Sequence, residues 1–299
     1  MKYIICFSCF LMVACYTPKK VGEYIQDKTQ PIMDSIAIGE RTLHYTKYGA
    51  ADDKEKLIFI HEVLLDQRMW LKQIDYFSKE YEVITIDMRG HGKSSEDVNS
   101  KLEEWENLKI IVDQEELKKV HICAYGLYAN SAINLALWKP DLISSLCLIS
   151  PNFPGEKIND SVYISLLASA NGDALRADWE AASKANFNLI VQGKDSKRKI
   201  DKWTQSYAQS SIADHLIDKK TVPKEYLKRI KLDNKIPYDR PVLLLTGAYD
   251  FDYFKDNVLG LRKSLSQAKN AEIKDAGKLV NLENEALFNQ LYYSFLKAL

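Results

Sequence analysis

Two side chains near one expected strand-to-helix junction of this 299-residue sequence, Cys123 and Ser131, are candidate nucleophiles. Cys123 carries a thiol, but it lies inside an apolar, strand-like run without an evident basic partner, so we expect a buried core residue. Ser131 lies more than one turn into the helix expected after that strand, where its hydroxyl would be poorly directed. Neither position indicates an activated nucleophile, which needs an adjacent base or a lowered pKa.

Acid–base and metal chemistry have equally little support. His215 is the candidate base in a segment that could move, and the other histidines fall in turns, a hairpin and a strand start, where we expect structural roles: His44, His61, His91 and His121. The carboxylates Glu62, Asp87 and Asp250 have no spacing that requires a metal ion, and no His/Cys cluster accompanies them. We therefore expect neither a metal nor a cofactor.

A parallel sheet is the element that would bring such residues together. KLIFI, YEVITID, HICAYG, SSLCLIS and PVLLLTG are short apolar runs, which is typical of strands buried on both faces. Helical spacing separates several of them, as in MWLKQIDYFSKE and ANSAINLALWKP, and residues 34–49 alternate as a hairpin would. The sequence predicts an α/β fold with a mostly parallel central sheet flanked by helices.

The strand–helix rhythm is interrupted once. Residues 152–236 are helix-like and rich in Lys, Asp and Ser, and we interpret them as a helical cap inserted into a core made of residues 34–151 and 237–299. The closing segment NEALFNQLYYSFLKAL keeps helical spacing to the end of the chain.

The N-terminus predicts export. Residues 1–14 contain Lys2 and an apolar run that is shorter than the ~20 residues of a spanning helix, as in a bacterial signal peptide. Small Ala14 before Cys15 resembles a lipobox, so we expect a lipid on Cys15, a polar tether over residues 15–33 and a place in the bacterial cell envelope. The membrane is then a partner through this anchor.

The composition further limits the classes of binding partner that we expect. Forty-one basic and forty-one acidic residues cancel, so no overall field attracts nucleic acid, and we expect no nucleic-acid partner. The apolar content of 46% and charged content of 27% are ordinary for a globular chain with a sizeable core. In the mature chain only Cys123 and Cys147 would accompany Cys15, which does not indicate a disulfide framework.

Several motifs occur in an order that identifies a family. FIHE with Trp70, DMRGHGKS over residues 87–94, GAYD ending at Asp250, and DAGKLVNLENEALFN containing Lys278 are similar to the HG…W, D-x-RGHG-x-S, acid and GAGH segments of α/β hydrolases. From about residue 34 to residue 299 the chain resembles that family. The resemblance implies an α/β-hydrolase fold with a cap and a serine–acid–histidine site at the carboxyl edge of the sheet.

The resemblance also shows where the site departs from the family. In Ala124-Tyr125-Gly126-Leu127-Tyr128 the family pattern G-x-S-x-G places glycine at the nucleophile, and Lys278 stands where the histidine is expected. An ammonium is a poor proton acceptor near neutral pH. Asp250 keeps the acid position, and we predict that it forms an ion pair with Lys278.

The oxyanion loops depart as well. The family's HG turn is His61-Glu62 here, and a carboxylate near a developing oxyanion would raise the barrier; Leu127 is the second oxyanion-loop position. Residues of neighbouring loops could line a remaining small-molecule cleft or fill it: Tyr125, Tyr128, Leu64, Tyr249, Phe251 and His215.

Three functional hypotheses follow. The first is a catalytically inactive pseudo-hydrolase that binds a small molecule or a protein. The second is an active α/β hydrolase with a non-standard site, acting on a small ester or amide. The third is a scaffold in an envelope complex, which would expose an extended apolar patch on the cap.

Overall fold

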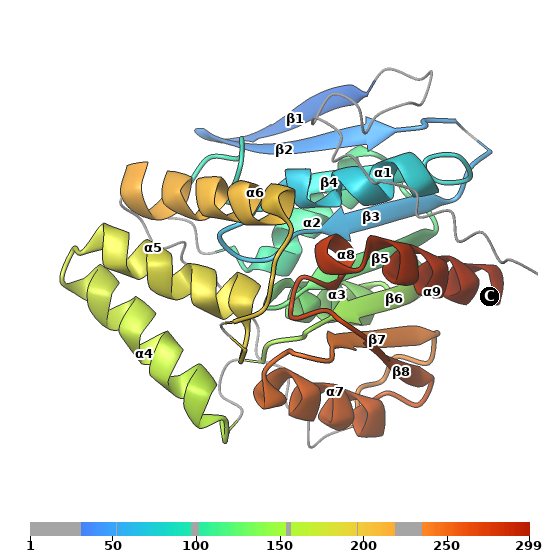
Figure 1. Ribbon diagram of the computed structural model, residues 1–299. Helices are drawn as coiled ribbons and strands as arrows, with labels where there is room; N and C mark the ends of the chain where they lie inside the picture. Colours follow the sequence, from blue (N-terminus) through green and yellow to red (C-terminus); the bar gives the residue numbers. More distant parts are fainter. Residues whose placement is uncertain (1–30, 52, 97–101, 154–156, 196, 219–234) are drawn as a thin grey trace, which may run out of the picture.

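One eight-stranded sheet runs through the residues that the computed structural model describes, which are 31–299 except 52, 97–101, 154–156, 196 and 219–234. The strand order is β1-β2-β4-β3-β5-β6-β7-β8 (Figure 1). β1 pairs with β2 and β2 pairs with β4 in antiparallel fashion, and all other neighbours are parallel. The predicted fold, a mostly parallel sheet flanked by helices, is confirmed.

Strands β1 and β2 fall on the predicted hairpin, strands β3 to β7 fall on the five apolar runs, and β8 is an addition. Their bounds are β1 Ile32–Ile38, β2 Arg41–Tyr48, β3 Lys56–Ile60, β4 Glu82–Asp87, β5 Val120–Tyr125, β6 Ile143–Ile149, β7 Val242–Gly247 and β8 Ala268–Ile273. Strand β1 begins at Ile32, so the last two residues of the predicted tether belong to the sheet. Strand β8 was not predicted, because it is an edge strand in which only Ile273 is buried.

Helices cover both faces of the sheet. One face carries η2 Gln67–Trp70, α1 Leu71–Phe77, α8 Val280–Glu283 and α9 Glu285–Lys297; the other carries α2 Glu104–Gln114, α3 Tyr128–Trp138 and α7 Asp252–Ser264 (Figure 1). Because successive strand residues point to opposite faces, Phe59 of β3 packs with α1 and α9, and its neighbour Ile60 packs with α3. This alternation explains why β3 is apolar along most of its length.

The cap lies between β6 and β7 in the chain. It comprises α4 Ser161–Leu175, α5 Trp179–Phe187, η3 Asn188–Gln192, α6 Lys202–Ala213 and η4 Asp214–Asp218. In Figure 1 these helices stand to the left of the sheet, on the side toward which β3 points. Since that side is the carboxyl edge of the parallel strands, the cap covers the edge where ligands of such sheets usually bind.

The predicted signal peptide and residues 15–30 of the predicted tether lie outside the described residues. Within the described ranges, no helix has the length and apolarity needed to cross a membrane. Cys123 and Cys147 are both buried free thiols on adjacent strands, as expected for core residues.

Candidate functional site

A sharp strand-to-helix turn at Gly126 is the centre of the site. Strand β5 ends at Tyr125, α3 begins at Tyr128, and Gly126 between them has a φ of 51°. The turn is held by hydrogen bonds from Gly126 N to Ile149 O (2.9 Å) and from Asn152 N to Gly126 O (2.9 Å). Glycine adopts this left-handed geometry without steric cost, so the bend persists at a residue that has no nucleophilic atom.

The carboxylate of Glu62 fills the space directly above that turn. A Cβ atom added to Gly126 would lie 2.4 Å from Glu62 Oε2 and 2.5 Å from Oε1. Glu62 is 3% exposed, and its Oε1 accepts a hydrogen bond from Val63 N at 2.9 Å. A serine side chain at position 126 therefore could not coexist with Glu62 in this conformation.

The charge of Glu62 is balanced by Lys278. Lys278 Nζ lies 2.7 Å from Glu62 Oε2, and the two side chains are 7% and 3% exposed. The ammonium also lies 4.5 Å from the ring centroid of Phe254, a cation–π distance. The predicted ion pair between Lys278 and Asp250 is therefore wrong, because the glutamate introduced at the HG turn is the carboxylate that Lys278 reaches.

Asp250 is instead bound to neutral donors. Its Oδ2 accepts from Ser150 Oγ at 2.5 Å and its Oδ1 accepts from Phe251 N at 2.9 Å. Complete burial raises the pKa of Asp250 to about 6, against the opposing effects of the Ser150 hydrogen bond and the nearby Lys278 charge. Ser150, at the end of β6, was not singled out from the sequence, although a serine directly after a buried strand was a signal for it.

The histidines near the site make structural hydrogen bonds. His61 Nε2 accepts from Met88 N at 3.0 Å, so its Nδ1 carries the proton that is donated to Glu62 O at 2.8 Å. Burial lowers the pKa of His61, which favours this neutral form. His91 repeats the arrangement, accepting from Leu64 N at 3.1 Å.

His215, the predicted mobile base, is held in place. It is 1% exposed, with Nδ1 2.9 Å from Ser211 O and Nε2 3.1 Å from Gly90 O. Both ring nitrogens therefore face backbone carbonyls, which leaves neither directed at a substrate.

Most of the residues predicted to line a cleft are packed into the core. Tyr125 donates to Asn281 Oδ1 at 2.8 Å, Tyr128 stands against the rings of His61 and His91, and Phe251 contacts Tyr163. Leu64 is 4% exposed, whereas Tyr249 is 39% exposed. The cavities described in the structure are lined by other residues.

The cap closes over the loop that carries Glu62. The hydroxyl of Tyr207 in α6 donates to Asp66 O at 3.0 Å and accepts from Asp66 N at 3.1 Å. Ser211, one turn further along α6, donates to Leu64 O at 3.0 Å. These bonds tie the cap helix to residues 64–66 and cover the Glu62 side of the turn.

A second cap contact supports Lys278, and sequence reasoning missed it. Arg198, between η3 and α6, forms a buried ion pair with Glu283 of α8 and donates to Val191 O at 2.8 Å. Glu283 in turn accepts from Gly277 N at 3.1 Å, immediately before Lys278. The cap thus helps to fix the backbone from which the lysine extends.

Metal chemistry has no site within the described residues, where no group of three or more His, Cys, Asp and Glu side chains could hold an ion. The buried acidic and basic groups at the turn are paired or hydrogen-bonded to protein atoms. The arrangement is an internally neutralised carboxylate seated on a sharp turn.

Comparison with curated proteins finds that this chain is similar in sequence to several hydrolases. The (E)-2-((N-methylformamido)methylene)succinate hydrolase of Acinetobacter baylyi is 30% identical over 261 residues, covering 86% of this chain and 95% of that protein. The 3-oxoadipate enol-lactonase 1 of the same bacterium is 23% identical over 254 residues, covering 81% and 89%. No family model matches the chain.

Solved structures agree on the fold. Carboxylesterase CesB from Bacillus subtilis superposes with a TM-score of 0.71 at 18% identity, covering 92% of this chain and 95% of that chain. MenH from S. aureus superposes with a TM-score of 0.66 at 21% identity, covering 85% and 98%. At these identities the likeness shows a shared fold.

Proposed function

Because this chain belongs to the α/β-hydrolase family, we propose that it is a pseudo-hydrolase, a binding protein that has kept the family's fold without its serine acyl transfer. The observation that carries the proposal is the Glu62 carboxylate, which occupies the volume above Gly126 where a nucleophile would project. The site is filled by a side chain of the protein itself.

The nucleophile, the oxyanion donors and the base that acyl transfer needs are each missing or unfavourable here. Gly126 offers no oxygen or sulfur atom to attack a carbonyl. The Glu62 carboxylate would repel the oxyanion of a tetrahedral intermediate, and loss of one good oxyanion donor alone typically costs about 2.7 to 4 kcal/mol. Lys278 forms an ion pair with that carboxylate, and an ammonium is a poor proton acceptor near neutral pH, so it does not serve as the base.

Labelling with a fluorophosphonate tests this directly, because the reagent reacts with an activated serine. We expect the purified protein to remain unlabelled under conditions in which an active serine hydrolase is labelled to completion. Labelling that approaches one equivalent, mapped to any serine of this chain, would overturn the proposal.

A second candidate is a hydrolase that uses carboxylates. The A. baylyi relative is named a hydrolase, and here two buried carboxylates, Glu62 and Asp250, lie near the turn. In such an enzyme Glu62 would leave Lys278 and activate a water molecule for attack on a small ester, amide or lactone. Replacement of Glu62 by Gln would then abolish turnover of such a substrate.

We further propose that the chain is exported and anchored in the bacterial envelope by a lipid on Cys15. The support is the sequence of residues 1–15, an apolar run that ends in Ala14 and Cys15. A Cys15→Ser variant should move from the membrane fraction to a soluble or uncleaved precursor form. Equal membrane association of both proteins, with no lipid on the parent chain, would contradict the anchor.

A further inference from the structure

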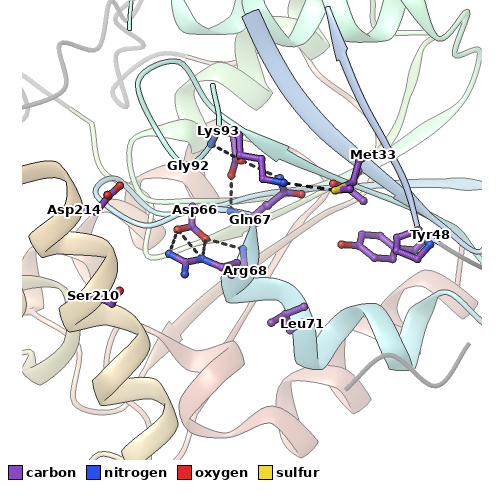
Figure 2. A pocket seen from close by; sticks show the side chains of 13 residues that line it. Met33, Tyr48, Asp66, Gln67, Arg68, Leu71, Gly92, Lys93, Ser210 and Asp214 are labelled. Atoms are coloured by element: carbon purple, nitrogen blue, oxygen red, sulfur yellow. Dashed lines mark hydrogen bonds and ion pairs between the residues drawn. The ribbon is translucent and has the colours of Figure 1, made fainter. Parts of the chain in front are cut away.

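A cavity of about 560 Å³ lies apart from the Glu62–Lys278 pair, between the β1–β2 hairpin, η2 and cap helix α6 (Figure 2). Its size falls within the range of small-molecule sites. Gly126, Glu62, Asp250 and Lys278 do not line it. Its walls come from both the core and the cap, and include Met33, Tyr48, Arg68, Leu71, Lys93 and Ser210.

Three carboxylates lie in the wall, Asp66, Asp87 and Asp214, and the first two accept several hydrogen bonds from the protein. Asp66 accepts from Arg68 N at 2.9 Å and from its guanidinium at 2.6 to 3.0 Å. Burial would raise the pKa of Asp66, but the hydrogen bonds and charge of Arg68 outweigh it and lower that pKa. Asp87 accepts from Gln67 N and Nε2, each at 2.9 Å, and from Lys93 N at 3.0 Å. All four carboxylate oxygens of Asp66 and Asp87 therefore accept hydrogen bonds from protein groups.

The two cationic side chains of the cavity, Arg68 and Lys93, have donor groups that are open to solvent. Arg68 binds Asp66 through Nε and Nη2, and its guanidinium lies 5.4 Å from the ring centroid of Tyr207. Its side chain is 50% exposed, and within the described residues Nη1 makes no hydrogen bond. The Lys93 ammonium lies 3.5 Å from Met33 Sδ (Figure 2), and among the described residues it forms no ion pair with a carboxylate. Both groups can donate hydrogen bonds to an anion that enters from solvent.

An apolar surface adjoins these donors. Met33, Tyr48 and Leu71 form part of the same cavity wall. A smaller cavity of about 230 Å³ shares Arg68 and Leu71 and adds the rings of Trp203 and Tyr207, which stack at 5.3 Å. Arg68 therefore stands between two apolar spaces, so a ligand held by its guanidinium can bury an apolar body on either side.

We propose that this cavity binds a small monocarboxylate with an apolar or aromatic body, whose carboxylate is held by Arg68 and attracted by Lys93. An arginine already oriented by a buried aspartate is preorganised to receive a carboxylate with its remaining N–H groups. The apolar body lies against Tyr48 and Leu71. This site goes beyond the proposed function, and it stands whether or not the Gly126 region turns over a substrate.

Calorimetric titration of the purified full chain with phenylbutyrate, its methyl ester and phenylbutylamine tests the charge requirement. We expect one equivalent of the acid to bind, with at least roughly tenfold weaker binding of the ester and the amine, because a charge-assisted hydrogen bond is lost. Equal binding of the acid and the ester, or no binding of the acid, would overturn the proposal.

Variants locate the bound acid. Lys93→Gln and Arg68→Lys should each weaken binding of phenylbutyrate several-fold, and Arg68→Lys keeps a cation beside Asp66 so that the fold is retained. Lys263→Gln, an exposed lysine on α7, is the matched control and should bind like the parent chain. Loss of binding in Lys278→Met with full binding in both cavity variants would place the acid at the Gly126 region and overturn the proposal.

Discussion

Lys278 Nζ lies 2.7 Å from Glu62 Oε2, and that carboxylate occupies the space in which a side chain at position 126 would lie. Three substitutions in separate segments therefore meet at one point. Glycine provides the space, glutamate fills it, and lysine neutralises the buried charge that the filling creates. Each residue is physically explained by the other two, which distinguishes the arrangement from a site with unrelated losses.

The Glu62–Lys278 pair should be strongly coupled in stability. Replacing one partner leaves an unpaired buried charge, and such losses typically cost about 3 to 5 kcal/mol. We expect Lys278→Met and Glu62→Leu each to destabilise the protein by that order, and the double variant to be far more stable than the sum of the two losses. Urea unfolding of the parent protein, the two single variants and the double variant gives the coupling energy by a double-mutant cycle. Additive losses would show that the two charges do not act on each other.

Gly126→Ala should destabilise the protein for two reasons. The residue has a φ of 51°, and a Cβ there would lie 2.4 Å from a Glu62 oxygen. Backbone strain of this kind costs on the order of 1 to 3 kcal/mol, and the clash adds to it. In a Glu62→Gly background only the strain should persist, so the penalty measured by urea unfolding should shrink. An unchanged penalty would mean that the carboxylate does not occupy this space.

Acyl transfer should return only when all three substitutions are reversed. Gly126→Ser alone should stay inactive on aryl esters, because Glu62 occupies the space of the new side chain. The triple variant E62G/G126S/K278H combines a nucleophile with a base beside Asp250 and should show turnover above buffer. The triple variant with Asp250→Ala added is the matched control and should lose most of it. Turnover by Gly126→Ser alone would contradict the role given to Glu62.

Asp250 should make the protein less stable as the pH rises from about 4 to about 6. Its folded pKa of about 6 exceeds the unfolded value near 4, so in this window the folded state holds a proton that the unfolded state has lost. The shift corresponds to a destabilisation of the folded state by roughly 3 kcal/mol, which is present in full above pH 6. Asp250→Asn should flatten this part of the profile of unfolding free energy against pH. Parallel profiles for the two proteins would contradict the raised pKa.

Much of the fold could be predicted from the sequence, because strands buried on both faces are continuous apolar runs. Strand β8 could not, since its exposed edge gives it the polar sequence AKNAEI. The position of Gly126 followed from the strand and helix that flank it, and that of Lys278 followed from the resemblance of DAGKLVNLENEALFN to the family's histidine segment. The partner of Lys278 did not, because the choice between Glu62 and Asp250 depends on the path of the lysine side chain over Phe254 and on the Ser150 hydroxyl that already binds Asp250.

The cavity beside Arg68 was also beyond sequence reasoning. Its walls join residues of the hairpin, η2 and α6 that are more than a hundred positions apart, as Met33 and Ser210 are. Only the packing of the cap against the core brings them together, through the Tyr207 and Ser211 hydrogen bonds to residues 64–66. No local pattern encodes such a contact.

The most direct test of the central claim is turnover of a panel of short-chain aryl esters, amides and small lactones by the purified protein, measured beside a Glu62→Gln variant. We predict no turnover above buffer for either protein, with both shown to be folded by circular dichroism. Turnover by the parent protein that Glu62→Gln abolishes would contradict it and assign Glu62 as a catalytic carboxylate.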